Sequence, residues 1–233
     1  MILVKETMAM NKGGNQKTVK RFNVGFRVSH WINAAAFFVL YISALPMYTE
    51  FFDWLYPVFG GPAGARLVHR FAAVAFMLPL PIMIIFDWKG FTNWAKNILS
   101  WKKHDLLFFP QFAKEFFGMK AKVPKQDFFN AGEKINSWLM IITTIMLICS
   151  GLIMWFPQYF AYGIIMWAYP IHNIGLGLAA AVAIGHIYMS LVTAKPSMRG
   201  IIKGDVSEEY AKDHHGRWYD ELQEEELKKK KHA

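Results

Sequence analysis

The apolar residues of this chain lie in four long blocks separated by charged segments, without the period of a strand or of an amphipathic helix. The blocks cover residues 26–48, 66–88, 135–156 and 169–193. A helix needs about 20 apolar residues to cross the hydrocarbon core of a bilayer, and each block reaches that length. The pattern therefore predicts an all-α integral membrane protein, a bundle of four transmembrane helices. Pro79 and Pro81 predict a kink in the second helix.

The distribution of cations predicts how this bundle lies in the membrane. The N-terminal segment with Arg27, the connector at residues 89–134 and the C-terminal tail together hold 24 of the 26 Lys and Arg residues. Because cytoplasmic segments carry the excess of Lys and Arg, we expect both termini and this connector to lie in the cytoplasm, with the helices in the cytoplasmic (inner) membrane. The expected divisions are a cytoplasmic segment 1–25, a four-helix domain 26–194 and a charged cytoplasmic tail 195–233.

Aromatic residues gather at two places outside the apolar blocks. In the connector at 89–134, Trp and Phe residues alternate with lysines. This pattern indicates either segments lying along the lipid headgroups or a soluble loop packed on a partner. The uncharged stretch 157–167 is rich in Trp and Tyr, as is typical of a membrane interface.

Composition excludes several other classes of protein. The chain is 54% hydrophobic, and its formal charge of +9 comes from cations placed between apolar blocks, so we expect no nucleic-acid partner. The single cysteine, Cys149, excludes an internal disulfide, a Cys-bound zinc site and an iron–sulfur cluster formed by this chain alone. No Cys-x-x-Cys-His motif for covalent haem attachment is present. Residues 1–25 lack the apolar core of a signal peptide, so we expect them to be retained.

Four of the eight histidines fall inside the predicted helices, where ionisable residues most often have a function. His172 and His186 are 14 residues apart, which places them roughly 21 Å apart along a helix and within about 40° of the same face. In the expected topology, His30 lies at the depth of His186 near the cytoplasm, and His69 lies at the depth of His172, about one turn from the outer end. The histidines therefore form an inner pair and an outer pair.

Two histidines from facing helices can provide both axial ligands of a haem iron. Small residues on the fourth helix would let a flat macrocycle approach: Gly175, Gly177, Ala179, Ala183 and Gly185. Packing histidines, a proton relay without Asp or Glu and a dinuclear metal site are weaker interpretations of two level-matched pairs. The residues thus predict a bundle that binds two haems between its helices and conducts electrons across a membrane.

These residues resemble a known family, the membrane cytochrome b (gamma) subunit of respiratory formate dehydrogenases. The resemblance covers roughly residues 20–220. It is carried by Ser-His-Trp-Ile-Asn at 29–33, by His69 with His172 and His186, by Phe-Asn-Ala-Gly-Glu-Lys at 129–134 and by His-His-Gly-Arg-Trp-Tyr at 214–219. Two departures are Glu133, where the family suggests Gln, and Gly216, where it suggests Pro.

The resemblance implies two haem b groups, an inner one held by His30 and His186 and an outer one held by His69 and His172. It also implies that Asn130 and Gly132, with His186, form a pocket for menaquinone or ubiquinone. The implied partners are an iron–sulfur subunit, which supplies electrons, and a molybdenum or tungsten subunit, which oxidises formate. Quinone reduction would then occur in this subunit, with lipid around it.

Two alternatives stay open at the level of sequence. The first is a cytochrome b subunit of a membrane-bound [NiFe] hydrogenase or of another molybdo-oxidoreductase, which keeps the chemistry and changes the donor. The second is a haem-free membrane anchor or transporter, although no internal repeat of the kind common in transporters is visible.

Overall fold

A computed structural model describes residues 17–117, 119–120 and 122–231, so the greater part of the N-terminal segment lies outside the described residues. The chain divides into two compact units. We call the first the bundle unit, formed by Phe22–Asn93 and Leu139–Tyr188. We call the second the loop-and-tail unit, formed by the N-terminal segment through Arg21, Trp94–Trp138 and Met189–Ala233.

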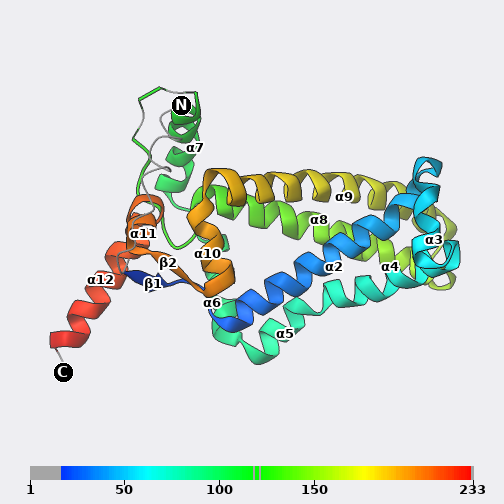
Figure 1. The fold of residues 1–233 in the computed structure, drawn as a ribbon, viewed down its shortest axis with the longest axis horizontal. Helices are drawn as coiled ribbons and strands as arrows, with labels where there is room; N and C mark the ends of the chain where they lie inside the picture. The colour runs from blue at the N-terminus through cyan, green and yellow to red at the C-terminus, as the bar shows by residue number, and fades with distance from the viewer. Residues whose placement is uncertain (1–16, 118, 121, 232–233) are drawn as a thin grey trace. The chain divides into compact units, whose positions relative to one another are not determined.

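The bundle unit consists mainly of the four predicted apolar helices. They are α2 (Val24–Tyr48), α4 (Pro62–Met77) continued by α5 (Pro79–Phe86), α8 (Ala131–Trp155) and α9 (Tyr162–Tyr188). Of these, α8 belongs to this unit only from Leu139 onward. Each is long and apolar enough to cross a membrane. Figure 1 shows α2 beside α4, and α8 beside α9. The prediction of a multi-pass helical membrane protein is confirmed.

The predicted kink in the second span is present as a break between α4 and α5 at Leu78. Pro79 and Pro81 have no N–H to donate to the preceding turn, so the helical hydrogen-bond ladder is interrupted there. Asn33 of α2 donates from its side-chain amide to the Phe76 carbonyl at 3.3 Å. A neighbouring helix thus satisfies a carbonyl beside the break, as a helix in lipid requires.

Two short connectors join neighbouring spans, one between α2 and α4 and one between α8 and α9. The first contains the 3₁₀-helix η1 (Glu50–Leu55) and the single turn α3 (Tyr56–Phe59). It ends in Gly60 and Gly61, whose φ angles of 77° and 96° favour glycine. The second contains the 3₁₀-helix η2 (Pro157–Tyr159).

The fourth apolar helix begins earlier than the sequence predicted. We expected residues 157–167 to form an interfacial belt before a helix starting near Tyr169, but α9 already begins at Tyr162. Residues 162–167 carry no charge and no proline, so nothing in this stretch prevents the helix from extending. Pro170 lies inside α9 without ending it.

The loop-and-tail unit contains several helices outside the four apolar blocks. The connector contains α6 (Trp88–Leu99) and α7 (Lys103–Phe116); the boundary between the units falls within α6 and α8. The tail contains a π-helical turn η3 (Met189–Thr193), α10 (Lys195–Lys203), α11 (Glu208–His214) and α12 (Gly216–Lys231).

A short antiparallel sheet joins the N-terminal segment to the tail within this unit. Strand β1 (Thr18–Lys20) pairs with β2 (Asp205–Ser207), with Thr18 opposite Ser207. Beside the sheet, the tail forms a small hydrophobic core of Val206, Tyr210, Ala211 and Trp218. The tail is therefore a folded element, and these two strands are an addition to the otherwise helical fold of the described residues.

Candidate cofactor sites

The inner pair of histidines comes from α2 and α9. The ring centres of His30 and His186 are 6.2 Å apart, and the ring planes are inclined by 55°. Trp31 packs edge-on against His30, with 5.3 Å between the ring centres. The two imidazoles therefore face one another across two helices that are distant in sequence.

The outer pair has nearly the same geometry on α4 and α9. The ring centres of His69 and His172 are 6.5 Å apart, and the planes are inclined by 61°. Gly151 of α8 lies against the His172 ring, because a Cβ added at Gly151 would stand 3.4 Å from the ring carbon Cε1. The structure thus brings together the two histidines of each expected pair, at two places along α9.

Each outer histidine also meets a serine hydroxyl. Ser43 Oγ lies 3.0 Å from Nδ1 of His69, and Ser150 Oγ lies 2.9 Å from Nδ1 of His172. Neither serine was predicted from the sequence, because a serine inside an apolar block gives no sign of which residue it will contact.

The outer pair lies deeper in its helices than we expected. His172 is ten residues from the first residue of α9 and His69 is seven residues from the first residue of α4. At about 1.5 Å per residue these distances are roughly 15 Å and 10 Å, instead of a single turn. The earlier start of α9 accounts for the difference at His172.

The small residues of α9 lie in two different surroundings. Gly175, Ala179 and Ala183 are buried, and a Cβ at Gly175 would stand 3.3 Å from Met146 of α8. Gly175 thus lets α8 and α9 approach closely. By contrast, no atom lies within 4 Å of a Cβ added at Gly177 or Gly185. Both glycines are exposed, so this open space is at the surface of α9 and is not the room that we expected for a macrocycle beside the histidines.

Asn130 and Gly132 lie in the loop-and-tail unit, where they begin α8. Asn130 Oδ1 accepts a hydrogen bond from the Glu133 backbone N–H, and Glu133 Oε2 accepts one from the Asn130 N–H, both at 2.9 Å. This reciprocal arrangement is a capping box. A Cβ on Gly132 would stand 3.2 Å from Asn130 Oδ1. Because glutamine serves in a capping box as well as glutamate, Glu133 preserves this local structure.

Behind the capping box lies a buried group of charged residues. Arg21 Nη2 donates to both Glu133 carboxylate oxygens at 3.0 Å and to the Phe128 carbonyl at 2.8 Å. His215 is fully buried; its Nδ1 lies 3.0 Å from the Asp127 carbonyl. Burial, together with the nearby Arg21 cation, lowers the pKa of His215 to about 4. His215 is therefore neutral at neutral pH, with Nδ1–H as a donor.

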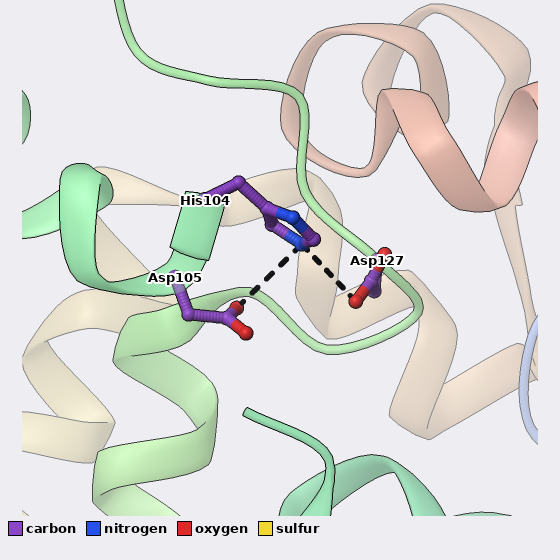
Figure 2. A group of neighbouring side chains, drawn as sticks. All are labelled: His104, Asp105 and Asp127. Carbon is purple, nitrogen blue, oxygen red and sulfur yellow. Dashed lines mark hydrogen bonds and ion pairs between the residues drawn. The ribbon is translucent and has the colours of Figure 1, made fainter. Parts of the chain in front are cut away.

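His104, Asp105 and Asp127 form a second polar cluster with donor atoms close enough to hold a metal ion. Figure 2 shows the His104 ring between the two carboxylates, with Nε2 3.9 Å from Asp105 and 3.1 Å from Asp127. Cations of the protein already serve both carboxylates. Lys134 lies 2.8 Å from Asp105, and Lys102 and Arg217 lie 3.0 Å and 3.1 Å from Asp127.

The charge balance of this cluster identifies it as an ion-pair network. Burial acts to raise the pKa of Asp127, but the hydrogen bond from Lys102 and the nearby His104 and Lys134 outweigh it and hold that pKa below its ordinary value. A divalent ion would have to displace the buried Lys134 ammonium to reach Asp105. The cluster therefore links α7, the start of α8 and the tail through ion pairs within the loop-and-tail unit.

Four apolar spans with facing histidine pairs at two positions along one helix define a membrane cytochrome b. The model of the prokaryotic cytochrome b561 family matches residues 21–204, and the chain belongs to this family. The family implies haem b as the cofactor.

The relatives found among curated proteins are formate dehydrogenase subunits. The chain is 31% identical to the cytochrome b556(Fdn) subunit of the nitrate-inducible formate dehydrogenase of Escherichia coli strain K12, over 87% of this chain and 91% of that relative. It is 29% identical to the cytochrome b556(fdo) subunit of the same organism, over 91% and 97%. It is 27% identical to the cytochrome b556 subunit of formate dehydrogenase of Haemophilus influenzae, over 89% and 84%. The resemblance stated from the sequence is confirmed.

Proposed function

We propose that this protein is the cytochrome b subunit of a formate dehydrogenase complex and passes electrons from an iron–sulfur partner subunit to a membrane quinone. In this proposal it holds two haem b groups, one between His30 and His186 and one between His69 and His172. The observation that carries the proposal is the presence of two facing histidine pairs built around a single helix.

The geometry of both pairs fits a metal held between two imidazoles. An imidazole–metal bond of about 2 Å, with roughly 1.1 Å from the nitrogen to the ring centre, places two opposed ring centres about 6 Å apart. The observed separations are 6.2 Å and 6.5 Å. Haem b supplies one-electron transfer when it is bound. The protein contributes the ligands, their orientation and an apolar surrounding that excludes water.

The topology proposed from the cations places both termini, the connector and the tail in the cytoplasm and the helices in the inner membrane. In this arrangement His69 and His172 are on the outer side, and the haem that they would hold would be the entry point for electrons from the partner. His30 and His186 are on the cytoplasmic side. The divisions proposed are then 1–25, 26–194 and 195–233.

The resemblance is the ground for proposing that Asn130, Gly132 and His186 bind quinone. Asn130 Oδ1 is engaged in capping α8, which leaves its Nδ2 amide group to donate to a quinone oxygen. His186 can donate through the ring nitrogen that does not bind iron. Protons for the quinol would be taken up from the cytoplasm.

The donor is tested by isolating the complex from native membranes in mild detergent and identifying its subunits by mass spectrometry. We expect an iron–sulfur subunit and a molybdenum or tungsten formate dehydrogenase subunit. A [NiFe] hydrogenase subunit in their place would overturn the assignment of the donor. In the same preparation, addition of formate should reduce a quinone analogue.

A matched pair of variants tests the quinone site. Asn130→Asp keeps the capping oxygen but removes the amide donor, so we expect it to lower quinone reduction while leaving haem content unchanged. Thr49→Asp is the control, because Thr49 Oγ1 also accepts a hydrogen bond at the start of a helix, from the Phe51 N–H at 3.4 Å, and gains the same carboxylate without losing an amide donor. Equal quinone reduction in both variants and in the unaltered protein would exclude Asn130 from the pocket.

A further inference from the structure

We propose that Ser43 and Ser150 are positioning residues for the outer haem: their hydroxyls fix the tautomer and orientation of His69 and His172 and lower the reduction potential of the haem that these histidines hold. This inference rests on the proposed function, since it takes His69 and His172 as the axial ligands.

The direction of each hydrogen bond follows from the ligand role of the histidine. Ser43 Oγ lies 3.0 Å from His69 Nδ1 and 3.1 Å from the Leu40 carbonyl oxygen. With Nδ1 against the hydroxyl, Nε2 is the nitrogen left to bind a metal, and a neutral imidazole bound through Nε2 carries its proton on Nδ1. Ser43 therefore accepts from the His69 Nδ1–H and gives its own proton to the Leu40 carbonyl oxygen, which can only accept.

Ser150 repeats this arrangement at the other ligand. Its hydroxyl donates to the Met146 carbonyl of the preceding helical turn and lies 2.9 Å from His172 Nδ1. The same reasoning places the His172 proton on Nδ1 and its free lone pair on Nε2. Ser43 and Ser150 are only 0% and 2% exposed, so water does not compete for these hydrogen bonds.

Each serine reaches the histidine from a different helix. Ser43 on α2 contacts His69 on α4, and Ser150 on α8 contacts His172 on α9. All four spans therefore take part in the outer site, two through ligands and two through hydrogen-bond acceptors. The orientation of both rings is set by neighbouring helices as well as by the helix that carries each ring.

An Nδ1–H that donates to an oxygen makes the opposite nitrogen a stronger electron donor. A stronger donor stabilises the oxidised metal, so the potential falls. The inner site differs at His30, whose Nδ1 is buried and has no hydrogen-bond partner among the described residues. The serines thus strengthen electron donation by both outer histidines, whereas Nδ1 of His30 has no such hydrogen bond among the described residues.

The test is a spectropotentiometric titration of full-length protein carrying Ser43→Ala, Ser150→Ala or the corresponding Thr substitution. His186→Ala provides a background that retains the outer haem alone, and the dihaem protein provides the same comparison with both haems. Each Ala variant should raise the reduction potential of the outer haem. We expect the oxidised-to-reduced equilibrium to shift toward the reduced form roughly three- to tenfold, which is about 30–60 mV for one electron. Its low-temperature EPR signal should change as the rings reorient.

The Thr variants should keep the potential of the unaltered protein, because they restore the hydroxyl. Thr143→Val is the matched control: Thr143 is buried on α8 and its hydroxyl also bonds a preceding carbonyl, at 2.9 Å. It should leave the outer potential unchanged.

Three results would overturn the inference: an unchanged outer potential in both Ala variants, a shift in the Thr variants as large as in Ala, or an equal shift in Thr143→Val. An Ala variant that loses the outer haem must regain it, at the original potential, as Thr. Failure of the proposed function looks different, because His69→Ala or His172→Ala would then retain the full haem content.

Discussion

Replacing Lys134 by methionine tests the account of the polar cluster beside α7. The Lys134 and Asp105 side chains are both 0% exposed. Lys134 Nζ donates to the two Asp105 oxygens at 2.8 Å and 2.9 Å and to the Ser100 carbonyl at 2.9 Å. The Lys134→Met substitution keeps the apolar stem and removes the ammonium, so it leaves the Asp105 carboxylate buried without its principal cation.

The expected loss follows from the burial of both charges. Removing one partner of a buried ion pair costs about 3–5 kcal/mol, because the other charge stays desolvated. Asp105 would keep only the hydrogen bond from the Lys102 backbone N–H, at 2.8 Å, and a distant His104. Asp105→Asn in the same chain removes that stranded charge, so the double variant should recover about half or more of the loss.

The assay is the free energy of unfolding in detergent micelles, from a denaturant titration followed by tryptophan fluorescence. Asp220→Asn is the control, because it breaks the exposed pair in which Lys125 and Asp220 are 65% and 54% exposed. Such a pair contributes at most about 1 kcal/mol. The reasoning is refuted if Lys134→Met costs no more than Asp220→Asn, or if Asp105→Asn fails to recover stability in the double variant.

Three further outcomes follow from the structure. The pKa of His215 in the folded protein, about 4, lies below its ordinary value of 6.5. The contribution of His215 to stability should therefore be constant above pH 6.5 and fall by about 3 kcal/mol as the pH drops from 6.5 through 4. Denaturant titrations at several pH values should show a weaker slope in His215→Gln than in the unaltered protein, and an equal slope would contradict the assignment. Gly25→Ala would place a Cβ 2.6 Å from Asp87 Oδ2 and should lower the free energy of unfolding by about 1–3 kcal/mol. Gly163→Ala is the control, because no atom lies within 4 Å of its Cβ, and it should leave stability unchanged. Equal thermal stability of the two variants would show that the contact at Gly25 relaxes freely. Asn130→Ala removes the cap of α8 and should cost about 1 kcal/mol of unfolding free energy; a loss below about 0.3 kcal/mol would mean that the capping box contributes little.

The sequence predicted the spans well because their signal is local and long. A block of more than 20 apolar residues has few folded alternatives, and the break at Leu78 follows from Pro79 and Pro81. The start of α9 was misplaced because Trp and Tyr suit both a membrane interface and a helix end. Hydropathy alone does not separate these two cases.

The parts that escaped prediction depend on contacts between distant residues. Strands β1 and β2 have three residues each and pair across most of the chain, so neither shows a period of its own. Lys134 was counted among the cations of the cytoplasmic connector, yet it is buried against Asp105. The capping box, by contrast, has a local signal that could have predicted it, since Asn130 precedes Glu133 by three residues before an apolar run.

The most direct test of the central claim is the number of haems per chain, from a pyridine haemochrome spectrum of the purified full-length protein with the polypeptide quantified independently. The account predicts two b-type haems per chain. It predicts one in His186→Ala and one in His69→Ala, with the remaining haem differing between the two variants in its potential. A single haem in the unaltered protein, two haems in either variant, or a folded colourless preparation would contradict the account.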